Sequence, residues 1–118
     1  MRVLLVDDEI ELTVMTARFL NARGYSQVET AHSPETAISN IESNKPDVVF
    51  LDINLNAPMS GMDVLRRVRK TSPQTRVCML SAFKDEYEAE AMKLGAVGFL
   101  KKPALINDLL TVLSLSEQ

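Results

Sequence analysis

Apolar residues follow two alternating patterns along the chain. Short unbroken runs, such as Val48 to Leu51, consist mainly of β-branched or aromatic residues, as in strands buried on both faces. Between these runs, apolar residues recur every three or four positions, as on one face of an amphipathic helix. This alternation predicts an α/β fold in which a parallel sheet carries helices on both faces.

The two patterns predict five strands and five helices in a single domain that spans residues 1–118. The expected strands are Val3–Val6, Gln27–Ala31, Val48–Leu51, Val77–Leu80 and Val97–Leu100. The expected helices lie at about 9–23, from Pro34 to a break at 44–46, around Val64–Val68, at Asp85–Leu94 and at Ile106–Leu115. Connectivity alone leaves the strand order open.

The first expected helix carries more apolar residues than one stripe can hold. Four of them recur at helical spacing and are expected to face the core: Leu12, Met15, Phe19 and Leu20. Ile10 and Val14 lie off this stripe and are expected at the surface. Gly24 can adopt the left-handed conformation that ends a helix.

Composition narrows the possible partners. The net charge is -3, and no run of Lys and Arg forms a stripe that could track phosphates, so direct nucleic-acid binding is not expected. The apolar run at the start is too short for a signal peptide or a membrane span, which predicts a cytoplasmic protein without membrane contact. The single cysteine, Cys78, is expected to be a buried thiol.

Polar residues follow four of the five expected strands, always at the carboxyl end. They are Asp7 and Asp8 after the first, Asp52 after the third, Ser81 after the fourth and Lys102 after the fifth. Each has an ordinary explanation when taken alone, such as a helix start, a turn or a solvated charge. Because the carboxyl ends of parallel strands share one edge, we expect the whole set to converge there.

Side chains that converge in this way suit cation binding and phosphoryl transfer. Three neighbouring carboxylates repel one another unless a cation neutralises them, and a set of oxygen ligands favours Mg²⁺. A phosphoryl group could then react with Asp52 as the nucleophile, while Lys102 neutralises its charge and Ser81 donates a hydrogen bond. His32 is expected at the surface, away from this edge, and not as the phosphodonor.

Four segments together resemble the receiver domain of two-component response regulators, over essentially the whole chain: residues 4–9, Leu51–Asn54, Leu80–Ala82 and Gly95–Pro103. The resemblance implies a doubly wound, flavodoxin-like sheet with strand order 2-1-3-4-5. It also implies a signalling switch that catalyses only its own phosphorylation and dephosphorylation.

The resemblance assigns a role to each site residue. Asp52 is similar to the phosphoacceptor, Asp8 to the direct Mg²⁺ ligand, and Asp7 to the acid that acts mainly through water. The remaining roles are the metal-binding backbone carbonyl of Asn54, the switch residues Ser81 and Phe99, and the family lysine, Lys102, with a cis peptide bond to Pro103.

The implied partners are a histidine kinase or phosphotransfer protein as donor, and an effector protein or fused output domain that reads the surface of the fourth helix, fifth strand and fifth helix. Ile10 and Val14 are expected to dock the donor, and a phosphorylation-dependent homodimer is possible. The loop 54–61 departs from the family, because Asn56 stands where a proline is common and the segment is one residue longer. Phe83 holds a position that tunes phosphoryl lifetime in the family.

Two other functions stay open on the residues. A Mg²⁺-dependent aspartyl phosphatase typically has a second acid two residues after the nucleophile, where this chain has Asn54. An unphosphorylated interaction module would have no need of the complete set of Asp52, Ser81 and Lys102. A flavin or nucleotide binder is disfavoured, since no glycine-rich loop follows any expected strand.

Overall fold

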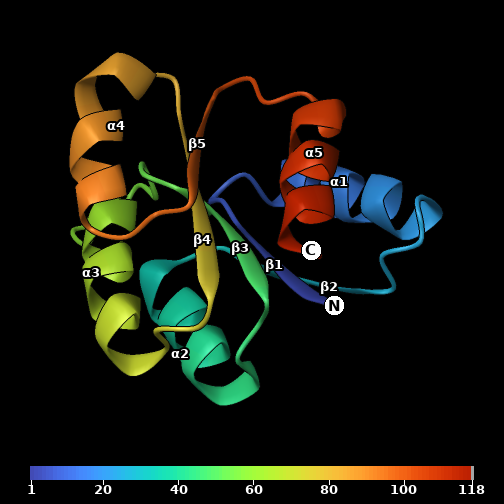
Figure 1. Cartoon of the computed structure of the whole chain (residues 1–118), viewed down its shortest axis with the longest axis horizontal. Coiled ribbons are helices and arrows are strands. Elements are labelled where there is room, and N and C mark those ends of the chain that lie inside the picture. The colour runs from blue at the N-terminus through green and yellow to red at the C-terminus, as the bar shows by residue number, and fades with distance from the viewer. Residues whose placement is uncertain (118) are drawn as a thin grey trace.

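The computed structural model of the chain describes residues 1–117 and contains one five-stranded parallel sheet (Figure 1). Its strand order is β2-β1-β3-β4-β5, the flavodoxin-like order that the resemblance implied. The strands are β1 (Arg2–Val6), β2 (Gln27–Ala31), β3 (Val48–Asp52), β4 (Arg76–Ser81) and β5 (Gly98–Lys101). Every residue of β3 is buried, as the apolar run predicted for the central strand.

Helices alternate with these strands, which confirms the predicted α/β architecture. They are α1 (Ile10–Ala22), α2 (Pro34–Asn44), α3 (Gly61–Thr71), α4 (Lys84–Lys93) and α5 (Ile106–Ser116). Local signals set several of their ends: the Ser33 hydroxyl caps α2 by accepting the N–H of Thr36, and Gly24 takes a φ of 98° after α1. Within residues 1–117, no helix is long and apolar enough to span a bilayer.

The helices cover the sheet in two groups (Figure 1). α2, α3 and α4 pack on one face over a large apolar cluster that includes Ile41, Leu65 and Met79. α1 and α5 lie on the opposite face over a smaller cluster that includes Leu20, Phe50 and Leu113. The carboxyl ends of the strands meet at the edge between these two layers.

The prediction for the buried face of α1 is wrong. Leu12, Met15 and Phe19 are 39%, 56% and 50% exposed, and only Leu20 of the expected stripe is buried. The stripe that faces the sheet runs through Thr13, Ala17 and Leu20, which are spaced as one helical face. Burial of Thr13 leaves no unsatisfied polar group, because its hydroxyl donates to the carbonyl of Ile10.

Candidate functional site

Three carboxylates gather at the carboxyl edge of the sheet. Asp7 and Asp8 follow β1, and Asp52 ends β3, which lies beside β1 in the sheet. Oxygen atoms of the three side chains lie within 4.8 Å of one another. Asp7 and Asp52 are 4% and 3% exposed, whereas Asp8 is more open to solvent. The edge therefore concentrates negative charge in a largely dry environment.

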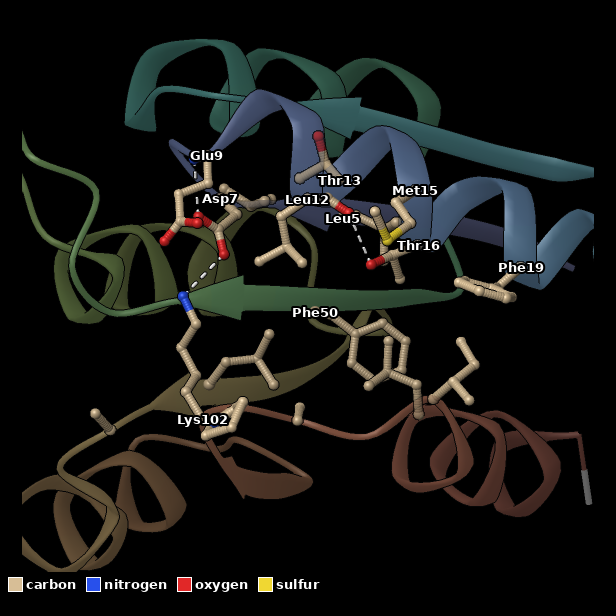
Figure 2. Close-up of a pocket in the computed structure, with 17 residues that line it drawn as sticks. Leu5, Asp7, Glu9, Leu12, Thr13, Met15, Thr16, Phe19, Phe50 and Lys102 are labelled. Carbon is tan, nitrogen blue, oxygen red and sulfur yellow. Dashed lines mark hydrogen bonds and ion pairs between the residues drawn. The ribbon is translucent and has the colours of Figure 1, made fainter.

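Lys102 bridges the two buried acids. It follows β5, and its Nζ donates to Asp7 Oδ2 at 2.9 Å and to Asp52 Oδ2 at 3.0 Å (Figure 2 shows the contact with Asp7). Burial disfavours the ammonium charge, but the hydrogen bonds and charges of Asp7 and Asp52 outweigh burial and raise the pKa of Lys102. The peptide bond between Lys102 and Pro103 is cis, as the resemblance implied.

Asp52 is held at both of its carboxylate oxygens. Oδ2 accepts from Lys102, and Oδ1 accepts the backbone N–H of Asn54 at 3.2 Å. Burial raises the pKa of Asp52, with a further contribution from the charge of Asp7, while Lys102 and the Asn54 N–H oppose this rise. The Asp52 carboxylate is therefore oriented and poorly solvated, and both properties suit a nucleophile.

The chemistry of the donor set fits a divalent cation. Asp7, Asp8 and Asp52 carry three negative charges when ionised, and Lys102 supplies one positive charge against them. The cluster contains carboxylate oxygens and no His or Cys ligand, which is the donor set of a hard cation. The site is therefore consistent with a divalent metal centre.

The two predicted switch residues are both buried on strands at this side of the sheet. Ser81 ends β4, is 5% exposed, and its Oγ accepts the N–H of Phe83 at 2.9 Å. Phe99 lies on β5 opposite Met79 and is 5% exposed within the larger apolar cluster. Because residues 79 and 81 point to the same face of β4, Ser81 and Phe99 share the side of the sheet that α4 covers.

His32 lies beside the acidic edge, which corrects the prediction that it lies away from it. β2 is parallel to β1, so the residue after β2 meets the residues after β1. The His32 Nδ1 donates to the carbonyl of Asp7 at 3.1 Å, and the Asp7 N–H donates to the carbonyl of Ala31 at 3.1 Å. His32 is half-buried rather than a free surface side chain.

Gly61 is a site residue that sequence reasoning missed. A Cβ at this position would lie 2.2 Å from the carbonyl oxygen of Asp52, so only glycine fits without a backbone shift. The Gly61 N–H donates to the carbonyl of Ile53 at 2.8 Å, which ties the start of α3 to the end of β3. The available signal was a glycine directly after the Ser60 cap of α3.

The loop before Gly61 is held by contacts of its own residues. Asn56, for which the resemblance leads us to expect a proline in the family, takes a φ of 52°, and asparagine tolerates this left-handed conformation. Its N–H donates to the Asn54 side chain at 3.2 Å, while Leu55 is buried and anchors the loop. These local contacts give the loop a defined conformation, and its extra residue relative to the family stays a prediction.

Three further predicted residues are placed by the structure as follows. Ile10 and Val14 on α1 are 56% and 40% exposed, so both are available at the surface. Cys78 is fully buried in β4, and this burial raises the pKa of its thiol to about 12.

Comparison with known proteins identifies the family. Residues 3–114 match the response regulator receiver domain, so the chain belongs to this family, whose standard function is phosphorylation-based signalling. The chemotaxis protein CheY of Thermotoga maritima is 31% identical over 86% of this chain and 85% of its own length. The receiver domain of NtrX from Brucella abortus superposes with a TM-score of 0.87 at 30% identity, covering 97% of this chain and 96% of that domain.

Several relatives are much longer than this chain. The protein-glutamate methylesterase/protein-glutamine glutaminase of Archaeoglobus fulgidus is 38% identical over 87% of this chain, which spans 30% of that enzyme. The chain likewise spans 22% of the nitrogen assimilation regulatory protein NtrX of Azorhizobium caulinodans. The receiver is thus a signalling switch that occurs both by itself and within larger proteins, some of which are enzymes by name.

Proposed function

We propose that Asp52 accepts a phosphoryl group from a phosphohistidine of a partner protein, either a histidine kinase or a phosphotransfer protein. The observation that carries this proposal is the bridge from Lys102 to Asp7 and Asp52 at 2.9 and 3.0 Å, beside a third carboxylate on Asp8. This constellation holds a buried nucleophile between a fixed cation and an oxygen-ligand site, which is what phosphoryl transfer requires.

The metal centre in this proposal takes Mg²⁺. Asp8 and Asp52 would bind it directly, together with the backbone carbonyl of Asn54, and Asp7 would act mainly through water. When bound, Mg²⁺ would neutralise the acids and the oxygens of the incoming phosphoryl group. The structure supports this assignment through the separation of the three carboxylates and the all-oxygen donor set.

The chain's own residues orient and complete the transfer. The Asn54 N–H and Lys102 Nζ hold the two oxygens of Asp52, so that one of them can attack phosphorus in line. The new bond joins this oxygen to phosphorus, the bond from phosphorus to the donor imidazole nitrogen breaks, and that nitrogen keeps the electron pair. Later attack of water on phosphorus releases inorganic phosphate and regenerates the carboxylate.

The added charge of about -2 supplies the signal. In the described structure Ser81 Oγ accepts the Phe83 N–H, and in the proposal it turns to donate to a phosphoryl oxygen. The repacking of Phe99 then alters the surface of α4, β5 and α5, which an effector protein, a fused output domain or a second phosphorylated copy would read. Ile10 and Val14 would dock the donor, and the cytoplasm is the expected location.

The test is intact-mass spectrometry after incubation with Mg²⁺ and acetyl phosphate, a small-molecule phosphodonor. We expect one labile phosphoryl adduct on the wild type and none on Asp52→Asn or on wild type with chelator. Asp85→Asn, which changes an exposed aspartate on α4, is the matched control and should be phosphorylated like wild type.

The outcomes separate the rival functions. Absence of an adduct, once rapid hydrolysis has been excluded by quenching at early times, would favour an unphosphorylated interaction module. Steady turnover of a small phosphate ester would favour an aspartyl phosphatase. An adduct that persists in Asp52→Asn would place the acceptor at another residue and contradict the proposal.

A further inference from the structure

Helix α1 exposes an unusual amount of apolar surface. Five of its 13 residues are large apolar side chains that are at least 39% exposed: Ile10, Leu12, Val14, Met15 and Phe19. Only Thr13 and Leu20 are buried. An apolar surface of this extent on one element marks an interaction site more often than chance exposure does.

This surface continues into a groove between α1 and α5 (Figure 2). The groove has a volume of about 610 Å³, its floor includes Leu5 and Phe50, and Leu12 and Phe19 project into it from α1. It runs from Asp7 and Lys102 at one end to Phe19 at the other. The apolar face of α1 therefore has a hollow along one side, which another element could fill.

The charges on α1 identify the element that fits. Glu11 and Arg18 are both exposed, and within residues 1–117 neither of them forms a salt bridge. They are seven residues apart, close to two full helical turns, so they lie on the same stripe. Val14 and Met15 lie between them near the middle of that stripe. The stripe is thus acidic at one end, apolar in the middle and basic at the other end.

Such a stripe is complementary to itself. When two copies of α1 pack antiparallel about a two-fold axis between residues 14 and 15, Glu11 of each copy faces Arg18 of the other. The same axis brings Leu12 of one copy towards Phe19 of the other on the side that borders the groove. Opposed helix dipoles favour this arrangement as well.

We propose that the exposed face of α1 binds α1 of a second copy of this chain in an antiparallel, two-fold symmetric contact. An isologous contact requires one patch that complements itself, which the order of Glu11, Val14, Met15 and Arg18 provides. A helix that packs antiparallel on this stripe must itself carry an acid near its start and a base two turns later, and α1 of a second copy has this order. Charge complementarity therefore selects a second copy as the occupant.

The size of the contact sets its strength. A helix of 13 residues is about 20 Å long, and its face buries less than the roughly 800 Å² per partner of a standard interface. We therefore expect a weak dimer with a dissociation constant on the order of 100 µM. Val14 also belongs to the proposed donor-docking surface, so donor and second copy would compete, but self-association itself does not depend on phosphorylation of Asp52.

Sedimentation analysis of the unphosphorylated chain, from about 10 µM to about 1 mM, tests the proposal through charge reversal. Glu11→Arg and Arg18→Glu each replace two attractions per dimer by two repulsions, so each should weaken self-association about tenfold. A one-to-one mixture of the two variants should restore it, because the mixed dimer pairs an acid with a base at both positions. The double variant should also associate like wild type.

Two controls separate a specific effect at α1 from a general change of charge and from misfolding. Glu35→Arg makes the same charge reversal in the first turn of α2, on the opposite face of the sheet, and should leave association unchanged. Circular dichroism of every variant checks folding. Wild type that stays monomeric up to about 1 mM, or single reversals whose mixture fails to associate, would overturn the proposal and leave the face to a different partner, such as the phosphodonor.

Discussion

The helices on the two faces of the sheet bury different fractions of their apolar side chains. On the first face, α2 and α3 bury large residues such as Ile41 and Leu65 completely. On the second face, α1 buries only Leu20 among its large apolar residues and leaves a groove towards α5. We call these the closed face and the open face.

The proposed phosphorylation site lies where the two faces meet. Gly61 on the closed face fixes the backbone at Asp52, because α3 approaches β3 too closely for any side chain. Lys102 and Asp7 border the groove of the open face. The comparison indicates a difference in packing: the closed face fixes the backbone of Asp52, the proposed nucleophile, while the open face leaves apolar side chains exposed.

The largest expected effect comes from truncating a leucine on each face. Leu65→Ala on the closed face should lower the free energy of unfolding by about 3 kcal/mol, since it leaves a cavity in a packed core. Leu12→Ala on the open face should cost less than about 1 kcal/mol, since that side chain is already 39% exposed. Urea unfolding at low protein concentration measures both. Equal losses in the free energy of unfolding would show that the groove closes in solution. They would contradict the distinction between a closed and an open face.

A smaller loss of stability is expected at the carboxyl edge of the sheet, where an ion pair rather than apolar packing links the strands. Lys102→Met keeps the length of the side chain but leaves Asp7 and Asp52 without their ammonium partner, which should cost about 2 kcal/mol at neutral pH. Lys101→Met is the matched control, because the neighbouring lysine is exposed and should change stability little. Thermal or urea unfolding at pH 7 compares the two. Similar losses in both variants would contradict a specific role of the Lys102 bridge.

The smallest expected effect is an increase in stability, whereas the substitutions above lower it. Burial raises the pKa of Asp52 above its ordinary value of about 3.9, so the folded chain binds a proton more tightly than the unfolded chain. Stability should therefore fall as pH rises through the interval between the two pKa values, and Asp52→Asn should remove this loss. We expect the variant to be about 1 kcal/mol more stable at pH 7 and to converge with wild type near pH 4.

Unfolding curves across this pH range, recorded without divalent cations, provide the measurement. Adding Mg²⁺ should then stabilise wild type by about 1.4 kcal/mol at ten times its dissociation constant, and the Asp52→Asn variant by less. A variant that is less stable than wild type at pH 7 would show that Lys102 outweighs burial at Asp52.

Much of the fold and of the site follows from local sequence. Apolar runs such as Val48 to Leu51 must be shielded on both sides, which requires a central parallel strand and helices on either face. Once the strands are parallel, Asp7, Asp52, Ser81 and Lys102 fall at one edge because each follows a strand. Both inferences need only the order of residues along the chain.

Other features depend on how segments that are distant in sequence pack together. The buried side of α1 was predicted from its large apolar residues, yet the crossing of α1 over the sheet selected Thr13 and Leu20 and left Phe19 exposed. Likewise, the contact of His32 with Asp7 follows from the position of β2 beside β1, and the need for glycine at position 61 from the approach of α3 to β3. The pattern along the chain therefore determined which elements form and where the reactive side chains meet. Only the tertiary structure decided which helix face stays open, because that depends on distances between elements that no local pattern encodes.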